Sequence, residues 1–537
     1  MNSPPDAIRL PSAFTGVCFY RLGWGLVLAA LLLQFWSRYL PTPSAVLVGD
    51  DWTNLARSEV VFSSDGEAIR AGMIDPNRPL SNTAVFVGYR WFGDQAWLWT
   101  ILSLAGNSLL LLFTMKMAME LTGRRMAAVL TGVGMALLPN LSQTYHWSTQ
   151  VLNEVACALV PYALSGWMWV AYVRRGGTWR LGISALGYFL GLFSYEAGIL
   201  LPAAYLVLLP WRTAPWKSLG RMVPFGVVFL LYVAWRRTNA FGLNQAIVYP
   251  PHMQEGFRVW GIARNAWDMF HWWAGDQMGE SLVFGFRSFS TISLWARRFL
   301  FAANVGVVSL LGWGLWRLAA AKKECESAGT FGRWQQAGFA GVWTLAAAVA
   351  PLMSYVVPRL LVLPAMGVSL LAALALARWP IGRWGPVLFL PALLCMTANQ
   401  GTAESFRQAG AMQQGLYAHL QDTAEEWQSK KILLLDTRAL RQRLTPGLIQ
   451  PVGEFQGTWA AYGEVPLMRG FVPLGMARVI TGRKVHEVQI VHDVENGARI
   501  DGDNLVWHDR YNPVRQHTNS VSEVFSVDVL LVGQGRR

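Results

Sequence analysis

The feature that most constrains this chain is a series of apolar runs that lack charged residues and are long enough to cross a bilayer. A helix of about 20 apolar residues spans the roughly 30 Å hydrocarbon layer. The sequence is 53% hydrophobic and 14% charged, and its apolar residues come in blocks. We therefore expect a polytopic α-helical membrane protein. The runs are residues 22–37, 95–115, 126–142, 155–173, 222–235, 299–316, 335–358, 360–377 and 384–402.

The basic residues predict the topology of these spans. They cluster in short connections that all fall on one side of the membrane if the N-terminus is cytoplasmic, as the positive-inside tendency requires. Residues 181–211 preserve this asymmetry only as a hairpin that turns near Glu196, which gives about eleven spans. The basic clusters are Arg124 and Arg125; Arg174, Arg175 and Arg180; Arg212, Lys217 and Arg221; Arg317, Lys322, Lys323 and Arg333; and Arg378 and Arg383.

The remaining segments are expected outside the membrane, on the extracytoplasmic side. Residues 41–94 and 238–295 form two loops, and the aromatic-rich second loop predicts interfacial amphipathic helices. Residues 1–403 form the transmembrane unit, and residues 404–537 form a small soluble α/β domain. Its strand patterns are "KILLLD", "VHEVQIVHDV" and "EVFSVDVLLVG". The net charge of +13 is spread over topology-setting loops, so we expect no nucleic-acid partner.

Several polar residues at the outer membrane face are candidates for function, because an unpaired charge at a bilayer is costly. Each also has a structural interpretation. Asp50 or Asp51 can cap a loop helix, and Arg78 can pair with Asp75 or Asp94. Glu196 and Arg359 stand alone in apolar sequence, which favours a functional role. The candidates are Asp50, Asp51, Arg78, His146, Glu154, Glu196 and Arg359.

The order of motifs over about the first 400 residues resembles the GT-C superfamily of polyprenyl-phosphate-dependent glycosyltransferases. The motifs are "DDW" after the first span, "NRPLSNTAVFVGYRWFGDQAWLW", "YHW", "SYEAGILLP" and "PRLLVLPAMG", followed by a soluble tail. The layout is similar to that of bacterial relatives of protein O-mannosyltransferases and of the lipid A aminoarabinose transferase. The resemblance implies an enzyme of the bacterial inner membrane, with Asp50 or Asp51 as general base or metal ligand.

Such a transfer needs a base for the acceptor proton and a cation for the departing phosphate. Either aspartate supplies the base, with inversion at the anomeric carbon, and its neighbour orients it, raises its pKa or binds a divalent metal. Arg359, assisted by Arg78, suits the phosphate. His146, Glu154 and Glu196 remain for the sugar hydroxyls or for a metal site.

The expected partners are a polyprenyl-phosphate-linked sugar, the bilayer, and a glycan, lipid or protein acceptor. Two other functions stay open from the sequence. One is a transporter or flippase for lipid-linked saccharides, although the chain shows no internal repeat. The other is a polysaccharide polymerase or ligase that uses a lipid diphosphate donor.

Overall fold

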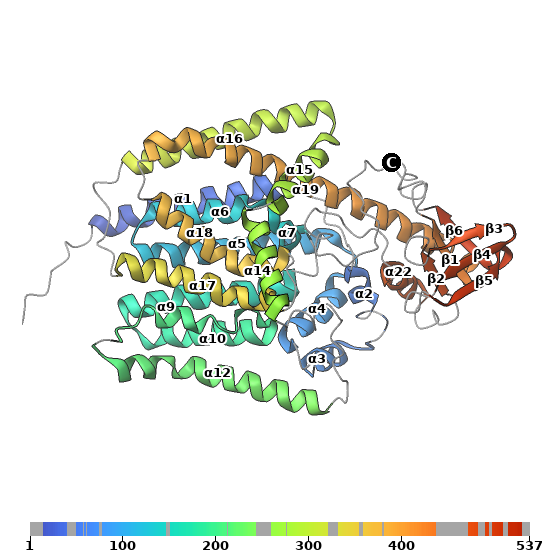
Figure 1. Cartoon of the computed structure of the whole chain (residues 1–537), viewed down its shortest axis with the longest axis horizontal. Coiled ribbons are helices and arrows are strands. Elements are labelled where there is room, and N and C mark those ends of the chain that lie inside the picture. The colour runs from blue at the N-terminus through green and yellow to red at the C-terminus, as the bar shows by residue number, and fades with distance from the viewer. Residues whose placement is uncertain are drawn as a thin grey trace, which may run out of the picture.

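A computed structural model shows a bundle of long helices with a small mixed domain attached at one end (Figure 1). The structure describes residues 14–39, 50–56, 58, 60, 62–74, 78–146, 151–211, 213–242, 259–274, 276–320, 331–353, 358–377, 381–436, 471–481, 489–492, 497–508 and 514–528.

Each apolar run of the sequence overlaps a helix of the bundle, which confirms the predicted polytopic helical class. Five helical segments are long and apolar enough to cross a membrane: Ala96–Thr122, Val151–Arg175, Pro215–Arg237, Leu294–Trp316 and Arg333–Met353. The bundle elements are α1(Phe14–Arg38), α5(Ala96–Thr122), α6(Arg125–Leu137), the π-helix η3(Val151–Leu159), α9(Val160–Arg175), α10(Thr178–Ser194), α11(Pro202–Leu206), α12(Pro215–Gly242), α16(Leu294–Ala320), α17(Arg333–Met353), α18(Val362–Leu376) and α19(Ile381–Asp422).

Residues 181–211, predicted as a hairpin, form a hairpin in the structure. Helix α10 ends at Ser194, Tyr195 is extended, and a 3₁₀ turn η4(Glu196–Gly198) leads into α11. The close packing of the turn depends on small residues, because a Cβ at Gly191 or Gly198 would overlap the ring of Tyr162. Glu196 therefore lies at the tip of the hairpin.

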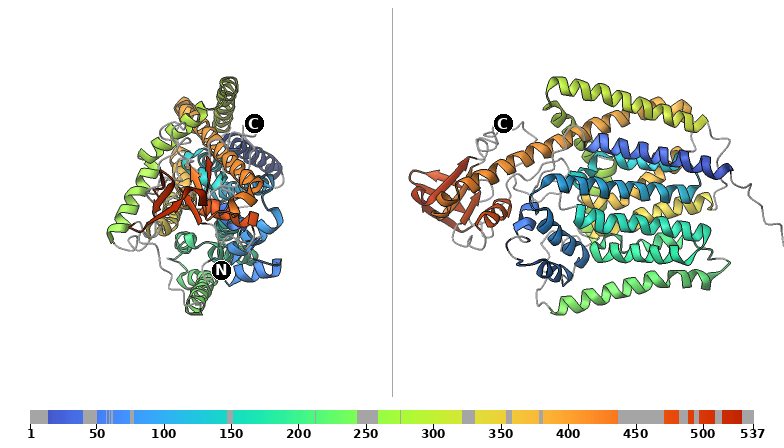
Figure 2. Two further views of the ribbon diagram at one scale, coloured as in Figure 1. Left: turned by 90° about the vertical axis from the view of Figure 1, so that its right-hand side faces the viewer. Right: turned by 180° about the vertical axis from the view of Figure 1, so that it is seen from behind.

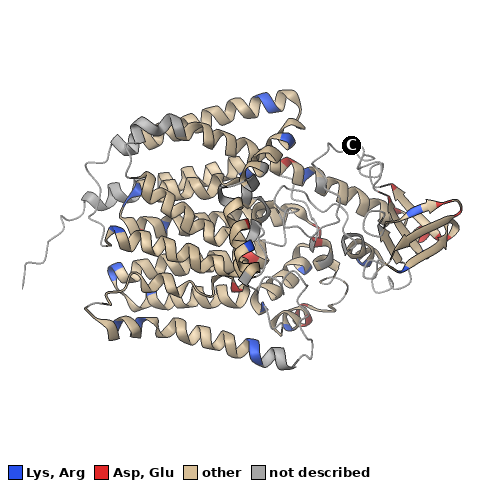
Figure 3. Ribbon diagram, viewed as in Figure 1, with Lys and Arg blue, Asp and Glu red and all other residues tan. Residues whose placement is uncertain are grey.

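The basic end of the bundle shows how charge is managed at a membrane surface. Glu120, near the end of α5, is buried and forms ion pairs with Arg174 and Arg175 in the last turn of α9. Gly123 ends α5 in the left-handed conformation that glycine adopts without strain. Figure 3 shows Lys and Arg at this end of several helices and further Lys and Arg at the opposite end, beside the C-terminal region.

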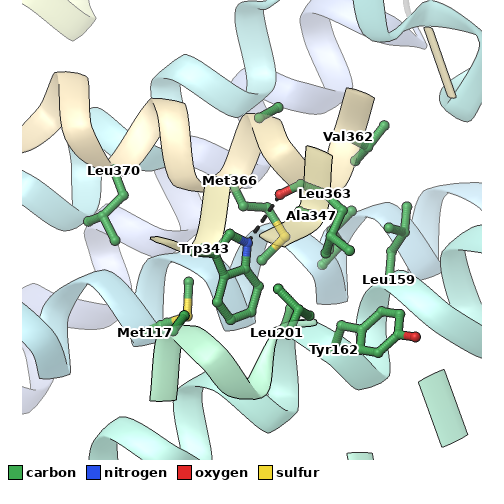
Figure 4. Close-up of a cluster of buried hydrophobic side chains, with 14 of the residues drawn as sticks. Met117, Leu159, Tyr162, Leu201, Trp343, Ala347, Val362, Leu363, Met366 and Leu370 are labelled. Atoms are coloured by element: carbon green, nitrogen blue, oxygen red, sulfur yellow. Dashed lines mark hydrogen bonds between the residues drawn. The ribbon is translucent and has the colours of Figure 1, made fainter. Parts of the chain in front are cut away.

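The centre of the bundle is packed with large apolar side chains (Figure 4). Trp343 of α17 is fully buried and donates its indole N–H to the carbonyl of Leu363, 3.1 Å away. Gly166 lets α9 approach, because an added Cβ would lie 2.7 Å from both Met117 and Trp343. This core fixes the helices whose outer ends carry the candidate residues.

Short elements gather at the other end of the bundle, beside the C-terminal region that contains the strands (Figure 1). They include α14 and α15, the helices predicted within the second outer loop. Their placement at the membrane interface stays a prediction. The elements are α2(Asp50–Ala56), α3(Asp65–Met73), α4(Pro79–Phe92), η2(Pro139–Leu141), α7(Ser142–His146), α14(Val259–Ala274), α15(Asp276–Ser290) and η6(Pro358–Leu361).

The C-terminal region contains helices and two small sheets, and all three predicted strand patterns form strands. The first sheet has the order β2-β1-β6 with parallel pairing, and Leu433 lies between Ile490 and Phe525. The second sheet, β3-β4-β5, is antiparallel. The elements are α20(Ala424–Gln428), β1(Ile432–Asp436), α22(Phe471–Thr481), β2(Gln489–His492), β3(Arg499–Asp501), β4(Asn504–His508), β5(Gln516–Ser520), η8(Val521–Glu523) and β6(Val524–Asp528).

Helix α19 joins the bundle to this region without a break, which all three ribbon views show (Figures 1 and 2). The predicted division at residues 403 and 404 falls inside that helix. A second hydrophobic core links the first outer loop to the C-terminal region. It contains Trp52 and Tyr89 from the loop and Leu416, Met476 and Leu433 from the C-terminal part.

A glycine contact between α15 and α19 generates a stability prediction. A Cβ on Gly401 would overlap the carbonyl oxygen of Gly285 and lie 2.6 Å from the backbone nitrogen of Phe289. Gly401→Ala should therefore lower the free energy of unfolding by about 1–3 kcal/mol, because backbone atoms must move apart. Gly341→Ala on α17, where an added Cβ meets nothing within 4 Å, is the matched control. Equal melting temperatures for both variants in detergent would contradict this packing.

Candidate functional site

An ion pair between two loop elements forms the best-defined polar contact at the outer end of the bundle. Arg78, which precedes α4, donates from Nε and Nη2 to the two carboxylate oxygens of Glu196 at 3.2 and 3.3 Å. Its guanidinium also lies over the ring of Tyr195, 3.9 Å from the centroid. The two charged side chains are 29% and 36% exposed. The pair is therefore both structurally fixed and reachable from water.

The charge state of Arg78 follows from these neighbours. Burial alone would lower its pKa, but the Glu196 carboxylate, followed by Tyr195, raises it above the ordinary value. The charge of Glu154 acts in the same direction. Arg78 is thus a permanent cation among acidic groups. The sequence offered Asp75 or Asp94 as a structural partner for Arg78; the structure pairs Arg78 with Glu196, and Asp75 lies outside the described residues.

Glu154 belongs to the same neighbourhood through η3, which packs against α4. Its side chain is only 2% exposed. The helix around it is a π-helix, a form that occurs frequently at functional sites. Gly88 allows the two elements to meet, because a Cβ there would overlap the side chain of Leu152. The structure thus brings together Arg78, Glu196 and Glu154.

Asp51 lies apart from this trio, in the interior of the outer loop. It is fully buried, and Tyr89 of α4, itself fully buried, donates a 2.7 Å hydrogen bond to its Oδ1. The Tyr89 ring packs on Trp99, with centroids 4.6 Å apart. This contact fixes α2 against α4. Asp50 begins α2, and its side chain lies outside the described residues.

The other face of α2 is held by the C-terminal half of α19. Trp52 donates its indole N–H to Oε1 of Gln413 at 3.0 Å, and its ring lies 4.8 Å from that of Tyr417. Helix α22 also packs against α2. The element that carries both aspartates is therefore clamped between the outer loop and the C-terminal region.

His146 ends α7 in a closed aromatic environment. Its ring centroid lies 6.2 Å from that of Tyr39 and 5.2 Å from that of Phe406. Within the described residues, its Nε2 is buried without a hydrogen-bond partner. Burial lowers the pKa of the imidazole to about 3, and the positive charge of Arg38 adds to the effect. His146 is therefore neutral at physiological pH.

Arg359 lies in η6, which packs against α7 and η2. The backbone therefore places Arg359 near the element that carries His146. Its side chain lies outside the described residues, so its distance to the acidic residues stays a prediction.

Sequence reasoning missed a further cation, Arg38 at the end of α1. Arg38 is fully buried, and its guanidinium donates to the carbonyls of Ala136 and Leu138 and to Oδ1 of Asn399. It also lies 4.5 Å from the ring centroid of Tyr145. The motif "FWSRYLP" is typical of an interfacial anchor, and only the tertiary contacts show that this arginine faces inward.

The described residues contain no group of three or more His, Cys, Asp or Glu side chains placed to hold a metal ion.

The neutral His146 generates a pH prediction. Its pKa is about 3 in the folded chain and near 6.5 in an unfolded one. The unfolded state therefore takes up a proton below pH 6.5 that the folded state does not, and folding stability falls as the pH decreases. His146→Phe removes this pH-dependent contribution to the free energy of unfolding. Between about pH 7 and pH 5, the melting temperature of the wild type should fall more steeply than that of the variant. Parallel declines would contradict the buried, neutral imidazole.

Comparison with known proteins finds a likeness among solved structures. No family model and no curated protein matches this chain. Among solved structures, the chain is similar to the crystal structure of ArnT from Cupriavidus metallidurans bound to undecaprenyl phosphate. The two share 16% sequence identity, the match covers 89% of this chain and 90% of that one, and the TM-score is 0.42.

Proposed function

We propose that the chain is a membrane glycosyltransferase that moves a sugar from a polyprenyl-phosphate donor to an acceptor hydroxyl on the extracytoplasmic face. The observation that carries the proposal is the gathering of ionisable side chains from distant segments at the end of the bundle beside the C-terminal region. Arg78, Glu196 and Glu154 lie together there, and α2 with its two aspartates packs on the same loop helix, α4.

A site at this position suits a reaction between a lipid and a water-soluble partner. The lipid delivers its phosphate and sugar at the bilayer edge, and the acceptor approaches from the water side. Charges are tolerated there because they face a hydrated surface or one another, whereas an unpaired charge within the hydrocarbon is costly. The partly exposed Arg78–Glu196 pair has this character.

We assign the general base to Asp50 and a positioning role to Asp51. A base must come within hydrogen-bond distance of the acceptor hydroxyl. Asp51 is fully buried and accepts a hydrogen bond from Tyr89, which supports a role in holding α2. In the proposed step, the acceptor oxygen bonds to the anomeric carbon and its proton passes to Asp50. The bond from that carbon to the phosphate breaks with inversion, and polyprenyl phosphate leaves with the electron pair.

The remaining residues bind the two substrates in this proposal. Arg359 holds the departing phosphate, since a guanidinium matches phosphate oxygens with a planar fork of donors. Glu196 accepts hydrogen bonds from sugar hydroxyls; burial alone would raise the pKa of Glu196, but Arg78 holds it below the ordinary value. Glu154, which is buried, supports the charge of Arg78 from behind. His146 is neutral, and its Nε2 has no hydrogen-bond partner within the described structure. It can therefore form a hydrogen bond with the polyprenyl-phosphate sugar.

The direct test is mass spectrometry of envelope glycans, lipids and glycoproteins from cells with and without this protein. We expect one class of molecule to lose a single sugar residue in its absence and to regain it when the wild type is restored. Identical envelopes under both conditions would refute the proposed function.

The assignment of the base predicts different outcomes for two acidic residues of the outer loop. Asp50→Asn should reduce sugar transfer in that complementation assay by about 100-fold or more, because the acceptor proton loses its base. The melting temperature should not change. Asp65→Asn is the matched control, because Asp65 is an exposed loop carboxylate paired with Arg90. Full transfer by Asp50→Asn would refute the assignment.

The positioning role of Asp51 predicts an effect on stability. Tyr89→Phe keeps the packing against Trp99 but removes the donor to Asp51, which should lower the free energy of unfolding by about 1–3 kcal/mol. Thermal melting of the purified protein measures the change. An unchanged melting temperature, combined with a loss of transfer in Asp51→Asn alone, would make Asp51 the base instead.

A further inference from the structure

Three helix ends meet at the end of the bundle that carries Glu120, opposite the C-terminal region. Helix α9 ends there, and α10 and α12, which pack against each other, both begin there. The rings of Tyr188 on α10 and Phe225 on α12 lie 5.8 Å apart. Arg180 and Lys217 precede these two rings by about two helical turns on their own helices. The two cations therefore lie at the same level on neighbouring helices.

Aromatic rings support two arginines at this level. The guanidinium of Arg221, one turn after Lys217 on α12, lies 5.7 Å from the ring centroid of Tyr172 near the end of α9. The guanidinium of Arg180 lies 4.4 Å from the ring centroid of Trp179 and donates to the carbonyl of Gly176 at 2.8 Å. These contacts hold both arginines close to the helix ends. We call Arg180, Lys217 and Arg221 the basic cluster.

The basic cluster differs from the neighbouring arginines because it lacks an acidic partner. The two arginines in the last turn of α9 share the carboxylate of Glu120. Among the described residues, Arg180, Lys217 and Arg221 form no ion pair. Figure 3 shows Lys and Arg at the left-hand end of α12. Like charges on neighbouring helices repel each other, and an anion bound between them would offset this repulsion.

Two exposed tryptophans place the basic cluster at the membrane surface. Trp179 is 56% exposed and Trp216 is 82% exposed, and they precede Arg180 and Lys217 directly in the sequence. Tryptophan is enriched where the hydrocarbon layer meets the lipid headgroups. Long basic side chains extend from that level toward water. The anion available to them there is the phosphate of an anionic phospholipid.

The positive-inside tendency alone does not explain this arrangement. Topology depends on how many positive charges lie on one side of the membrane, and it does not require them to converge. Arg333, the exposed first residue of α17, supplies such a charge at the same end of the bundle. Helix α17 packs mainly on α18 and α11. The basic cluster, in contrast, combines two packed helices with aromatic supports.

We propose that the basic cluster binds the headgroup of a phospholipid with two phosphates, of the cardiolipin class. A guanidinium matches phosphate oxygens with its planar fork of donors, and Lys217 adds a point charge. Packed helices lie about 8–10 Å apart, so cations on α10 and α12 match two linked phosphates better than one. The site lies at the opposite end of the bundle from the Arg78–Glu196 pair. It goes beyond the proposed function, and no step of sugar transfer uses it.

Three single variants separate this site from general positive charge. Arg180→Gln and Arg221→Gln each remove one cation of the basic cluster, from α10 and from α12. Arg333→Gln is the matched control, because it removes the same charge from an exposed arginine at the same end of the bundle. Melting temperatures in lipid-free detergent establish that all three variants fold.

The experiment is native mass spectrometry of the delipidated full-length protein titrated with tetraoleoyl cardiolipin. We expect Arg180→Gln and Arg221→Gln each to weaken binding of the first cardiolipin by about tenfold, because each removes a charge-assisted bond to phosphate. Arg333→Gln should change binding by less than about twofold. Dioleoyl phosphatidylglycerol, which has one phosphate, should bind the wild type about tenfold less tightly than cardiolipin.

Equal weakening in all three variants would overturn the proposal, because positive charge at this end would then suffice. Phosphatidylglycerol binding as tight as that of cardiolipin would overturn the assignment of two phosphates. Competition by soluble glycerophosphoglycerol at the concentration of the lipid would show a site for a free phosphate diester and would overturn the lipid assignment. These results do not depend on sugar transfer, so the site and the proposed function can fail separately.

Discussion

The cost of placing an unpaired charge in hydrocarbon governs this structure. At the basic end of the bundle, Glu120 is buried but paired with two arginines. At the other end, Arg78 and Glu196 neutralise each other where both reach water. Arg38 is the exception, because its buried charge is bonded to backbone carbonyls and an amide. The positions of polar side chains at the outer end therefore carry information about function.

This constraint explains why the helices were predictable from the sequence. A span must be continuously apolar, so its signal is local, and even the turn at Glu196 followed from the distribution of basic residues. Strand β1 was predictable for the same reason, because "KILLLD" is a short apolar run bounded by polar residues.

The contacts that build the site were not predictable, because they join distant parts of the chain. Arg78 and Glu196 are 118 positions apart, and the bond from Trp52 to Gln413 spans 361. No local pattern marks either pair. The inward orientation of Arg38 was missed because a basic residue after a span is typical of an interfacial anchor. Identities of candidate residues can thus be predicted from a single sequence, but their partners cannot.

The clamp on α2 gives the C-terminal region a structural role in the site. Trp52 of α2 packs on α19, and α22 packs against α2. Both aspartates therefore sit on an element that depends on residues beyond the last span.

The most direct measurement is an experimental structure of the protein in a lipid nanodisc with polyprenyl phosphate bound. The account predicts one water-filled hollow at the end of the bundle beside the C-terminal region, with the lipid phosphate beside Arg359 and the carboxylate of Asp50 opening onto the same space. A polyprenyl phosphate bound at the basic end, or packed helices separating Asp50 from Arg359, would contradict it.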